Sequence, residues 1–412
     1  MESYIVDWIG LILRWLHVIT GIAWIGASFY FIWLDNSLVE PPQWKIDKGI
    51  KGDLWAVHGG GIYEVAKYRA APETMPPHLH WFKWEAYSTW ITGMLLLAVI
   101  YYLGAEAYLI DPRVATLSAT QAVLLGVGFI IGSWLIYSLL CASVLARNGW
   151  LLGAVLLLLG AALAWALAQL FSGRGAYIHF GAIIGTLMVG NVFRVIMPGQ
   201  RRLVAALEAG DPVDPAWGER AKLRSTHNTY LTLPLLFIMI SNHYPMTYAH
   251  GANWAILLAI VLISAGSRQY FILRHKQIHR PLILGAAALA TLILALIIAP
   301  WPKSSQPAAP ALARAELTPR AEAILRERCA SCHAADPTDE VFTVAPGGVL
   351  LETTVQMQQW SARIKARAVD SHDMPFMNKT GMTDAERAIV DQWIAAGAPV
   401  APEAHRARRG CS

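Results

Sequence analysis

Eight long apolar segments dominate the first three quarters of this chain. A helix needs about 20 residues to cross a hydrocarbon core about 30 Å thick, and most of these segments are long enough. The sixth is the weakest candidate because it is short and contains Pro234. The sequence therefore predicts an all-α fold in which residues 1–301 form a polytopic eight-helix transmembrane bundle. The segments cover approximately residues 6–34, 85–104, 119–142, 150–171, 176–197, 228–243, 253–273 and 281–300.

The composition supports a membrane protein and excludes two other classes. Of the 412 residues, 55% are hydrophobic and only 15% are charged, whereas an average soluble domain has about 25% charged residues. An ordinary soluble protein is therefore excluded. A disordered chain is excluded as well, because this apolar content can offset the entropy of ordering. Four cysteines are too few for a disulfide scaffold.

The net charge of +5 belongs entirely to residues 1–301, where it lies between the apolar segments. Fifteen Lys and Arg residues occupy alternate connections, and the other three connections hold only Arg113 and Arg174. Cytoplasmic loops carry an excess of Lys and Arg. We therefore expect a lipid bilayer around the bundle, with both chain ends outside the cytoplasm, and no nucleic-acid partner. The basic connections are 35–84, 143–149, 198–227 and 274–280.

Glycines recur at helix-packing spacing in two of the segments. Gly128 and Gly132 lie in the third, and Gly181 and Gly185 lie in the fifth. Such pairs permit close approach of two helix backbones, although glycine is common in transmembrane helices in any case. Both interpretations stay open from the sequence.

The last quarter of the chain has the composition of a linker followed by a soluble domain. Residues 302–316 are rich in Pro, Ala and Ser, as in a semi-rigid linker. Residues 317–400 have the length of a compact domain, and residues 401–412 form a tail. Thr318-Pro319 predicts the start of a helix. Thr383 to Glu386 predicts a capping box, and Gly397 a helix stop.

The run Cys329-Ala330-Ser331-Cys332-His333 is the c-type haem attachment signature. Each thiol can form a thioether with a haem vinyl group, and the adjacent imidazole becomes an iron ligand. A bare C-x-x-C is more often a redox or zinc pair. The following histidine, the preceding helix and the expected location outside the cytoplasm favour haem c. The sequence therefore predicts one covalent haem c in a C-terminal class I cytochrome c-like domain.

A second iron ligand is expected downstream of His333. Met374, which is followed by Pro375, lies 41 residues beyond it. Methionine and histidine ligation raises the potential of a haem and so suits an electron acceptor. The competing candidates are His372, Met377 and Met382. The remaining cysteines carry less information, since Cys141 suits a small core residue and Cys411 has no evident partner.

Several histidines lie in or beside the apolar segments. His17 falls near the middle of the first segment, and His179 and His243 near the outer ends of the fifth and sixth. Ionisable residues within a membrane are functional candidates, although a lone one is often a hydrogen-bonded packing residue. Electrons that cross a bilayer need a relay, so we consider a haem b held by His17 and by either His179 or His243. His227, followed by Asn228, is a candidate acid or base near the cytoplasmic face.

The connection at 35–84 is the longest of the seven and has two dense motifs. His58 begins a His-Gly-Gly-Gly run, and His80 precedes Trp81, Phe82 and Trp84. Glycines permit close approach of the backbone to a ligand, and tryptophans offer stacking faces. An amphipathic segment at the membrane interface explains the same residues equally well. His58 and His80 are accordingly further catalytic candidates.

These motifs together resemble the bacterial membrane-bound urate oxidases, or urate hydroxylases, which carry a C-terminal cytochrome c. The resemblance rests on the run of twelve residues from Val57 and the run of nine from Leu79. It also rests on the run from Thr226 through Pro245, and on C-A-S-C-H. It implies oxidation of urate to 5-hydroxyisourate in purine degradation, in a bacterial inner membrane. The electrons would leave through haem c to a periplasmic cytochrome c or a terminal oxidase.

Two other functions compete with this one. A membrane dehydrogenase for quinol or another small molecule would need paired histidines on two helices for its haems. A haem or copper transport protein is the other alternative, because His17 followed by Trp24-Ile25-Gly26 resembles small membrane haem proteins. Reduction of haem c by urate distinguishes an enzyme from both.

Overall fold

The computed structural model describes residues 2–299, 314–339, 342, 344–370, 372 and 374–400, and most of them are helical. They divide into two compact units. The first comprises residues 1–244 and 252–297, and the second comprises residues 298–412 with the short segment 245–251. Most of the expected linker at 302–316 lies outside the described residues, as does the tail at 401–412.

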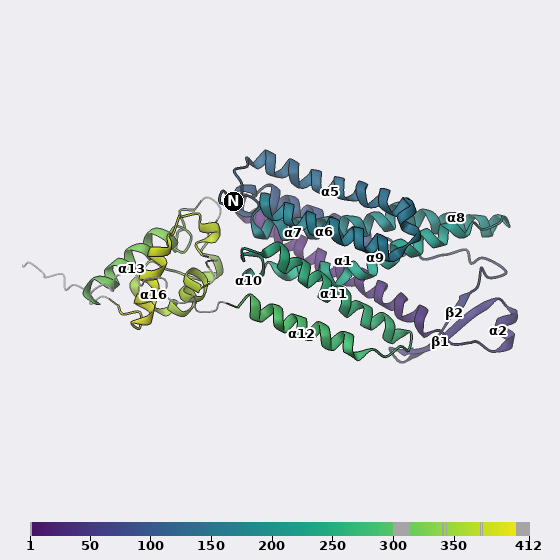
Figure 1. The fold of residues 1–412 in the computed structure, drawn as a ribbon. Helices are drawn as coiled ribbons and strands as arrows, with labels where there is room; N and C mark the ends of the chain where they lie inside the picture. Colours follow the sequence, from purple (N-terminus) through teal and green to yellow (C-terminus); the bar gives the residue numbers. More distant parts are fainter. Residues whose placement is uncertain are drawn as a thin grey trace, which may run out of the picture. The chain divides into compact units, whose positions relative to one another are not determined.

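All eight apolar segments form helices in the first unit (Figure 1). Among the described residues, five helical stretches are long and apolar enough to cross a membrane. They are Trp8–Ser37, Ala119–Ala142, Gly149–Leu170, Gly173–Ala209 and Asn253–His275. The structure thus supports a multi-pass membrane protein, while the number of eight crossings stays a prediction. The long elements are α1 (Glu2–Ser37), α3 (Trp84–Leu96) continued by η1 (Leu97–Tyr102), α5 (Ala119–Ala142), α6 (Gly149–Leu170), α7 (Gly173–Asn191) continued by η3 (Val192–Ile196) and α8 (Met197–Ala209), α9 (Pro215–Ser241), α11 (Asn253–His275) and α12 (Pro281–Ile297).

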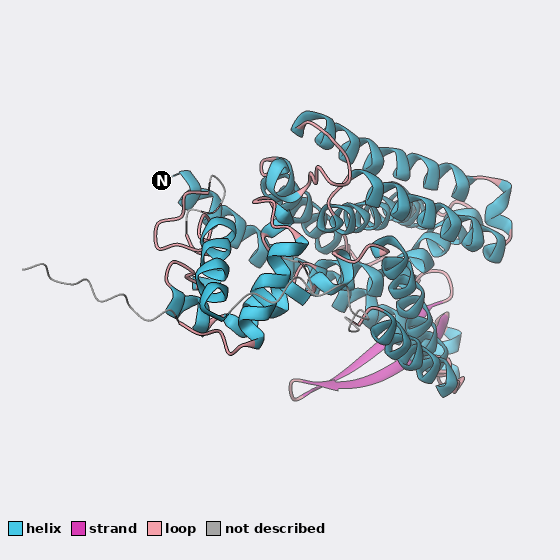
Figure 2. Ribbon diagram, turned by 60° about the vertical axis from the view of Figure 1, so that its left-hand side comes forward, coloured by secondary structure: helices cyan, strands magenta, loops and turns pink. Residues whose placement is uncertain are grey.

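Short helices lie between these elements in the connections. They are α2 (Gln43–Asp47), α4 (Ala105–Tyr108), η2 (Val144–Arg147) and α10 (Pro245–Tyr248). Within the first unit α1 packs on α3, while α7 packs on α5 and α9, and α11 packs on α9 and α12 (Figures 1 and 2). Many large apolar side chains remain exposed on the helices, among them Trp15, Trp150 and Leu158. Such an apolar surface is expected of helices that face lipid.

The connection expected at 198–227 is largely helical. α8 continues to Ala209 and ends at Gly210, whose φ of 71° is left-handed, and α9 already begins at Pro215. The Asp214 side chain accepts a hydrogen bond from the backbone N–H of Ala216 and so caps α9. Because α9 begins this early, the polar residues just before the sixth apolar segment lie on a regular helix. Arg224 and Asn228 are buried on this helix, whereas Ser225 and Thr226 are exposed.

A β-hairpin in the connection 35–84 was not expected in an all-α fold (Figure 2). β1 (Ile50–His58) pairs antiparallel with β2 (Gly61–Tyr68), and His58 is opposite Gly61. Gly59 and Gly60 form the two-residue turn with φ of 58° and 80°. Positive φ at both central residues is what such a turn requires, and glycine adopts it without strain. The glycine run therefore has a structural explanation.

The prediction that glycines allow close helix packing is correct for Gly181 only. A Cβ added at Gly128, Gly132 or Gly185 would meet nothing within 4 Å. At Gly181 the Cβ would lie 2.6 Å from Cγ2 of Ile238 on α9, so this position does need a glycine. The closest helix approach on α5 is instead at Gly126, which the sequence spacing did not single out.

The second unit is a small helical domain around one apolar core. α13 packs on α16, and Leu325, Met357, Val390 and Trp393 are fully buried between the elements. Its elements are α13 (Arg314–Cys329), η4 (Pro346–Gly348), α14 (Thr354–Gln359), α15 (Ser361–Ile364), η5 (Lys365–Asp370), η6 (Phe376–Asn378) and α16 (Asp384–Ala395).

Two of the three helix signals in this unit are correct. The capping box joins Thr383 and Glu386, and Gly397 follows α16 with a φ of 91°. The expected start at Thr318-Pro319 is wrong, because α13 is already helical at Arg314 and Thr318 is buried. Thr318 is the fifth residue of α13 and therefore cannot be its N-cap.

Candidate functional site

A hydrogen-bonded polar network joins three helices inside the first unit. Tyr137 on α5 has its hydroxyl 2.8 Å from Nδ1 of His227 on α9. The same phenol oxygen accepts a hydrogen bond of 2.9 Å from Nδ2 of Asn191 on α7. His227 is half-buried, and its Nε2 has no hydrogen-bond partner in the described part of the chain. The imidazole is thus held through Nδ1, and its second nitrogen is left for another group.

Two more residues of α9 complete this network. Asn228 is buried, accepts a 2.8 Å hydrogen bond from Asn191 and donates one of 3.0 Å to the carbonyl of Met188. The guanidinium of Arg224, which is only 6% exposed, lies 4.7 Å from the ring centre of Tyr137. It also donates a 3.3 Å hydrogen bond to Oδ1 of Asn191. A permanent positive charge therefore lies next to the Tyr137 and His227 pair.

The sequence identified part of this network. His227 and Asn228 were both expected site residues, and the structure brings them together. Tyr137, Asn191 and Arg224 were missed, since Arg224 was counted as a loop charge. Its spacing of three and four residues from His227 and Asn228 was the available signal, because such positions share one helix face.

The other two catalytic candidates take no part in this network. His58 is exposed at the end of β1 and faces the hairpin turn. His80 is 71% exposed, with Nε2 3.9 Å from a carboxylate oxygen of Glu85 and its ring against Phe82. Neither has a hydrogen bond to the residues of the network among those described.

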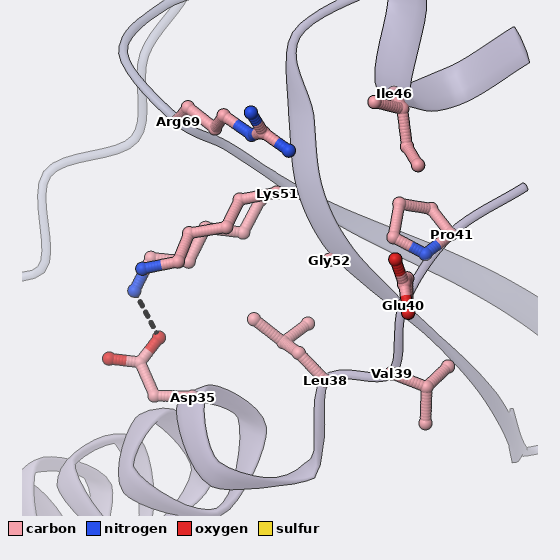
Figure 3. A pocket seen from close by; sticks show the side chains of 10 residues that line it. Asp35, Leu38, Val39, Glu40, Pro41, Ile46, Lys51, Gly52 and Arg69 are labelled. Atoms are coloured by element: carbon pink, nitrogen blue, oxygen red, sulfur yellow. Dashed lines mark hydrogen bonds and ion pairs between the residues drawn. The ribbon is translucent and has the colours of Figure 1, made fainter. Parts of the chain in front are cut away.

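A groove of about 390 Å³ lies at the base of the hairpin (Figure 3). Asp35 at the end of α1 forms a 2.6 Å ion pair with Lys67 of β2, and Lys51 points toward the same carboxylate. Lys67 and Asp35 are each about half exposed. Such an exposed pair contributes little binding specificity or stability.

The histidines expected to hold a haem b lie at different levels of the unit. His17 has Nδ1 3.0 Å from both the carbonyl of Thr89 and the hydroxyl of Thr92. His179 is fully buried, and its ring lies beside Tyr102. Both contacts are with the continuous helix α3–η1, and Thr92 and Tyr102 are ten residues apart, which is about 15 Å. These contacts do not place the two rings around one iron, and a haem b stays an untested prediction.

His179 and His243 differ in their surroundings. His179 donates from Nδ1 to the carbonyl of Gly175 at 2.9 Å, while its Nε2 has no hydrogen-bond partner among the described residues. A Cβ at Gly126 would lie 2.4 Å from that Nε2, so the ring is tightly enclosed. His243 is exposed just beyond the end of α9.

The second unit places the Cys-x-x-Cys-His run at the end of its first helix. α13 ends at Cys329, which is buried, and Cys332 is half-buried. Burial raises the pKa of the Cys329 thiol to about 12. It also raises the pKa of Cys332. Nδ1 of His333 lies 2.9 Å from the carbonyl of Val349. Histidine ligands are commonly oriented by such a bond, which leaves Nε2 for the metal.

Met374 lies at the edge of the core of the second unit, where it is half-buried. Its backbone N–H donates a 2.9 Å hydrogen bond to the carbonyl of Arg367. The guanidinium of Arg387 donates a 2.8 Å hydrogen bond to the carbonyl of Met374. Met382 is fully buried in the core, and His372 is exposed. The side chain of Met377 and residue Asp373 lie outside the described residues.

The remaining cysteines have no separate site. Cys141 is buried on α5, with its sulfur 3.9 Å from Nδ1 of His227. It therefore borders the polar network and was expected only as a core residue. Cys411 lies in the tail outside the described residues.

Comparison with known proteins decides the family of the first unit. A family model described as Urate oxidase N-terminal matches residues 3–299. The chain belongs to this family. The match covers α1 to α12 and so includes Tyr137, Asn191 and His227. No curated protein and no solved structure gave a match. Membership in a urate oxidase family indicates an oxidoreductase, and the second unit lies outside the matched range.

Proposed function

We propose that this urate oxidase family member is a membrane-bound urate oxidase that converts urate to 5-hydroxyisourate in purine degradation. Urate and one water molecule give 5-hydroxyisourate, two protons and two electrons. Because water supplies the oxygen atom of the product, a separate acceptor has to take the two electrons. The observation that carries the proposal is the buried network around His227, because it lies within the range that matches the family.

The network has the groups that this reaction needs. Removal of two protons calls for an acid or base, and a neutral imidazole is the side chain best suited to accept one near pH 7. The free Nε2 of His227 takes that proton, and Tyr137 shares a hydrogen bond with the opposite nitrogen. Arg224 adds a fixed positive charge, which stabilises negative charge that develops on the purine.

The second unit offers a matching set of groups for a covalent haem c. Cys329 and Cys332 would form the thioethers, His333 would ligate iron through Nε2, and Met374 would supply the sulfur ligand. The bond from His333 to the carbonyl of Val349 supports this assignment, because it leaves Nε2 free. When bound, the haem supplies a one-electron acceptor of high potential.

The route of the electrons follows from the charge asymmetry of the connections. With the basic connections in the cytoplasm, the second unit lies in the periplasm of a bacterial inner membrane. A periplasmic cytochrome c or a terminal oxidase would then take the electrons from the haem. Urate made in the cytoplasm would enter from the opposite face.

The experiment is to add urate to membranes that contain the oxidised protein and record the haem c spectrum without oxygen. Each urate should reduce two haems and form 5-hydroxyisourate. Protein carrying Cys329→Ala and Cys332→Ala is the control, because it retains the first unit without attached haem. Absence of urate-dependent haem reduction in the wild-type protein would refute the proposal.

A further inference from the structure

A buried arginine lies on α11, which packs on α9, the helix that carries His227. Arg268 on α11 is 4% exposed. Its Nε and Nη2 have no hydrogen-bond partner, and no carboxylate pairs with it among the described residues. Its guanidinium carbon lies 4.0 Å from the ring centre of Phe29 on α1. Arginine stays charged in proteins, and a buried charge is costly unless an opposite charge accompanies it.

This arginine lines a pocket of about 440 Å³ whose other walls are mostly aromatic. Phe29, Tyr30 and Trp33 of α1 form one side, and Phe271 and His275 of α11 with Leu233 of α9 form the rest. Aromatic rings stack on planar molecules, and a guanidinium adds attraction for an anion. The pocket thus combines a place for a flat ring system with one unpaired positive charge.

We propose that this pocket binds the planar purine anion that the enzyme oxidises, with Arg268 as its counter-charge. The inference rests on the proposed function, since it names the place where the substrate is held. The Nε and Nη2 donors of Arg268 lie along one edge of the guanidinium. These two atoms are enclosed by protein, so Arg268 acts on the bound anion through its charge rather than through a bidentate contact.

Two other occupants fit the pocket less well. A quinone would stack on the same rings but brings no negative charge to Arg268. A lipid phosphate brings negative charge but no planar ring to stack on Phe29, Tyr30 and Trp33, and Arg268 lies seven residues before the end of α11 at His275. Seven residues of helix correspond to about 10 Å.

The pocket and the polar network lie at different positions along α9. Leu233 lies six residues beyond His227 on this helix, which is about 9 Å along its axis. Tyr230 lies between them and donates a hydrogen bond to Gln269, the residue that follows Arg268. α9 therefore contributes Leu233 to the pocket and His227 to the polar network.

The test compares Arg268→Gln with Arg274→Gln, an exposed arginine on the same helix. Binding of radiolabelled urate is measured on protein fully reduced with dithionite, which cannot turn urate over. Steady-state KM and kcat are measured on oxidised protein. We expect Arg268→Gln to raise both the Kd and the KM for urate at least tenfold with kcat changed much less, and Arg274→Gln to leave all three unchanged.

A second variant covers the case in which Arg268→Gln does not fold. Leu233→Trp fills the pocket without removing a charge, and it should weaken urate binding to a similar extent while haem content stays normal. Wild-type affinity and KM in both folded variants would overturn the inference and leave the proposed function intact. A wild-type protein that neither binds nor oxidises urate would instead refute the proposed function. An effect of Arg268→Gln on the reaction with ubiquinone-1 alone would assign the pocket to a quinone and overturn this inference.

Discussion

The hydroxyl of Tyr137 on α5 lies 2.8 Å from Nδ1 of His227 on α9. Asn191 donates a hydrogen bond to the same phenol oxygen. When a neutral His227 carries its ring proton on Nδ1, that N–H donates to the phenol oxygen as well. Nε2 of this tautomer is unprotonated and can accept a proton from substrate or water.

Removal of the phenol hydroxyl should therefore slow catalysis without breaking the fold. Tyr137→Phe keeps the ring beneath Arg224 and loses the contacts of the hydroxyl with His227 and Asn191. We expect kcat for urate to fall at least tenfold, since positioned acid and base groups contribute about 10²–10⁴-fold. Turnover is followed by urate absorbance, with Tyr63→Phe on the exposed hairpin as control. Unchanged kcat in Tyr137→Phe would show that this hydrogen bond has no part in the reaction.

Loss of the imidazole should have a larger effect than loss of its partner. We expect His227→Ala to lower kcat by about 10²–10⁴-fold while haem c content stays normal. Thr226→Ala is the matched control, because Thr226 precedes His227 and is exposed. If His227→Ala oxidises urate at the wild-type rate, the acid–base role belongs to another residue.

Close packing at Gly126 yields a prediction about stability. A Cβ there would lie 2.4 Å from Nε2 of the fully buried His179, whereas a Cβ at Gly128 would meet nothing within 4 Å. Overpacking typically costs about 1–3 kcal/mol. We expect Gly126→Ala to lower the thermal unfolding temperature in detergent and Gly128→Ala to leave it unchanged or raise it. Equal unfolding temperatures for the two variants would contradict this packing.

The sequence was sufficient for the helices and insufficient for what lies between them. Apolar length alone predicted α5, α6 and α11, because a segment that faces lipid has to be apolar along its whole length. The hairpin was missed because its strands lie outside the apolar segments, where alternation is weak and the glycine run also suits a ligand loop. Gly59 and Gly60 reveal their role only through their positive φ.

Knowledge of the site was limited for a related reason. Cys329, Cys332 and His333 lie within five residues of one another, so the prediction of a haem c site rests on local sequence alone. Tyr137 and Asn191 meet His227 from two other helices, and such contacts depend on helix rotation, which apolar periodicity does not determine here. Arg224 was misassigned because the start of α9 was placed too late.

An ion pair in the second unit should make its stability depend on pH. Arg328 on α13 lies 2.9 Å from the carboxylate of Glu386 on α16. Burial acts to raise the pKa of Glu386, but hydrogen bonds from Arg328 and Thr383 outweigh it, and the net pKa is lowered. A carboxyl whose pKa is lowered by folding stabilises the fold above its ordinary pKa, and this contribution is lost as pH falls through the lowered value.

Glu386→Gln should therefore destabilise the second unit at pH 7 and have a smaller effect in acid. We expect a lower thermal transition for the variant at pH 7, followed through haem c absorbance of the full chain. The difference from wild type should shrink once the pH falls below the ordinary pKa of a glutamate. Glu316→Gln on the exposed side of α13 is the control. A difference that grows in acid would contradict the lowered pKa.

The choice between Met374 and Met382 as iron ligand can be decided with two variants. Met374 packs at the edge of the core and is fixed by backbone hydrogen bonds, whereas Met382 is fully buried within it. Met374→Ala should keep the haem attached, because the thioethers remain, but should lower its reduction potential, since methionine ligation raises it. Met382→Leu conserves volume, costs less than about 1.5 kcal/mol and should leave the potential unchanged. Redox titration of the haem c absorbance measures the reduction potential of both variants. A lowered potential in Met382→Leu alone would assign Met382 as the iron ligand. Under the proposed function urate reduces this haem, so the variant with the lowered potential should also show slower urate-dependent reduction, with urate affinity unaffected.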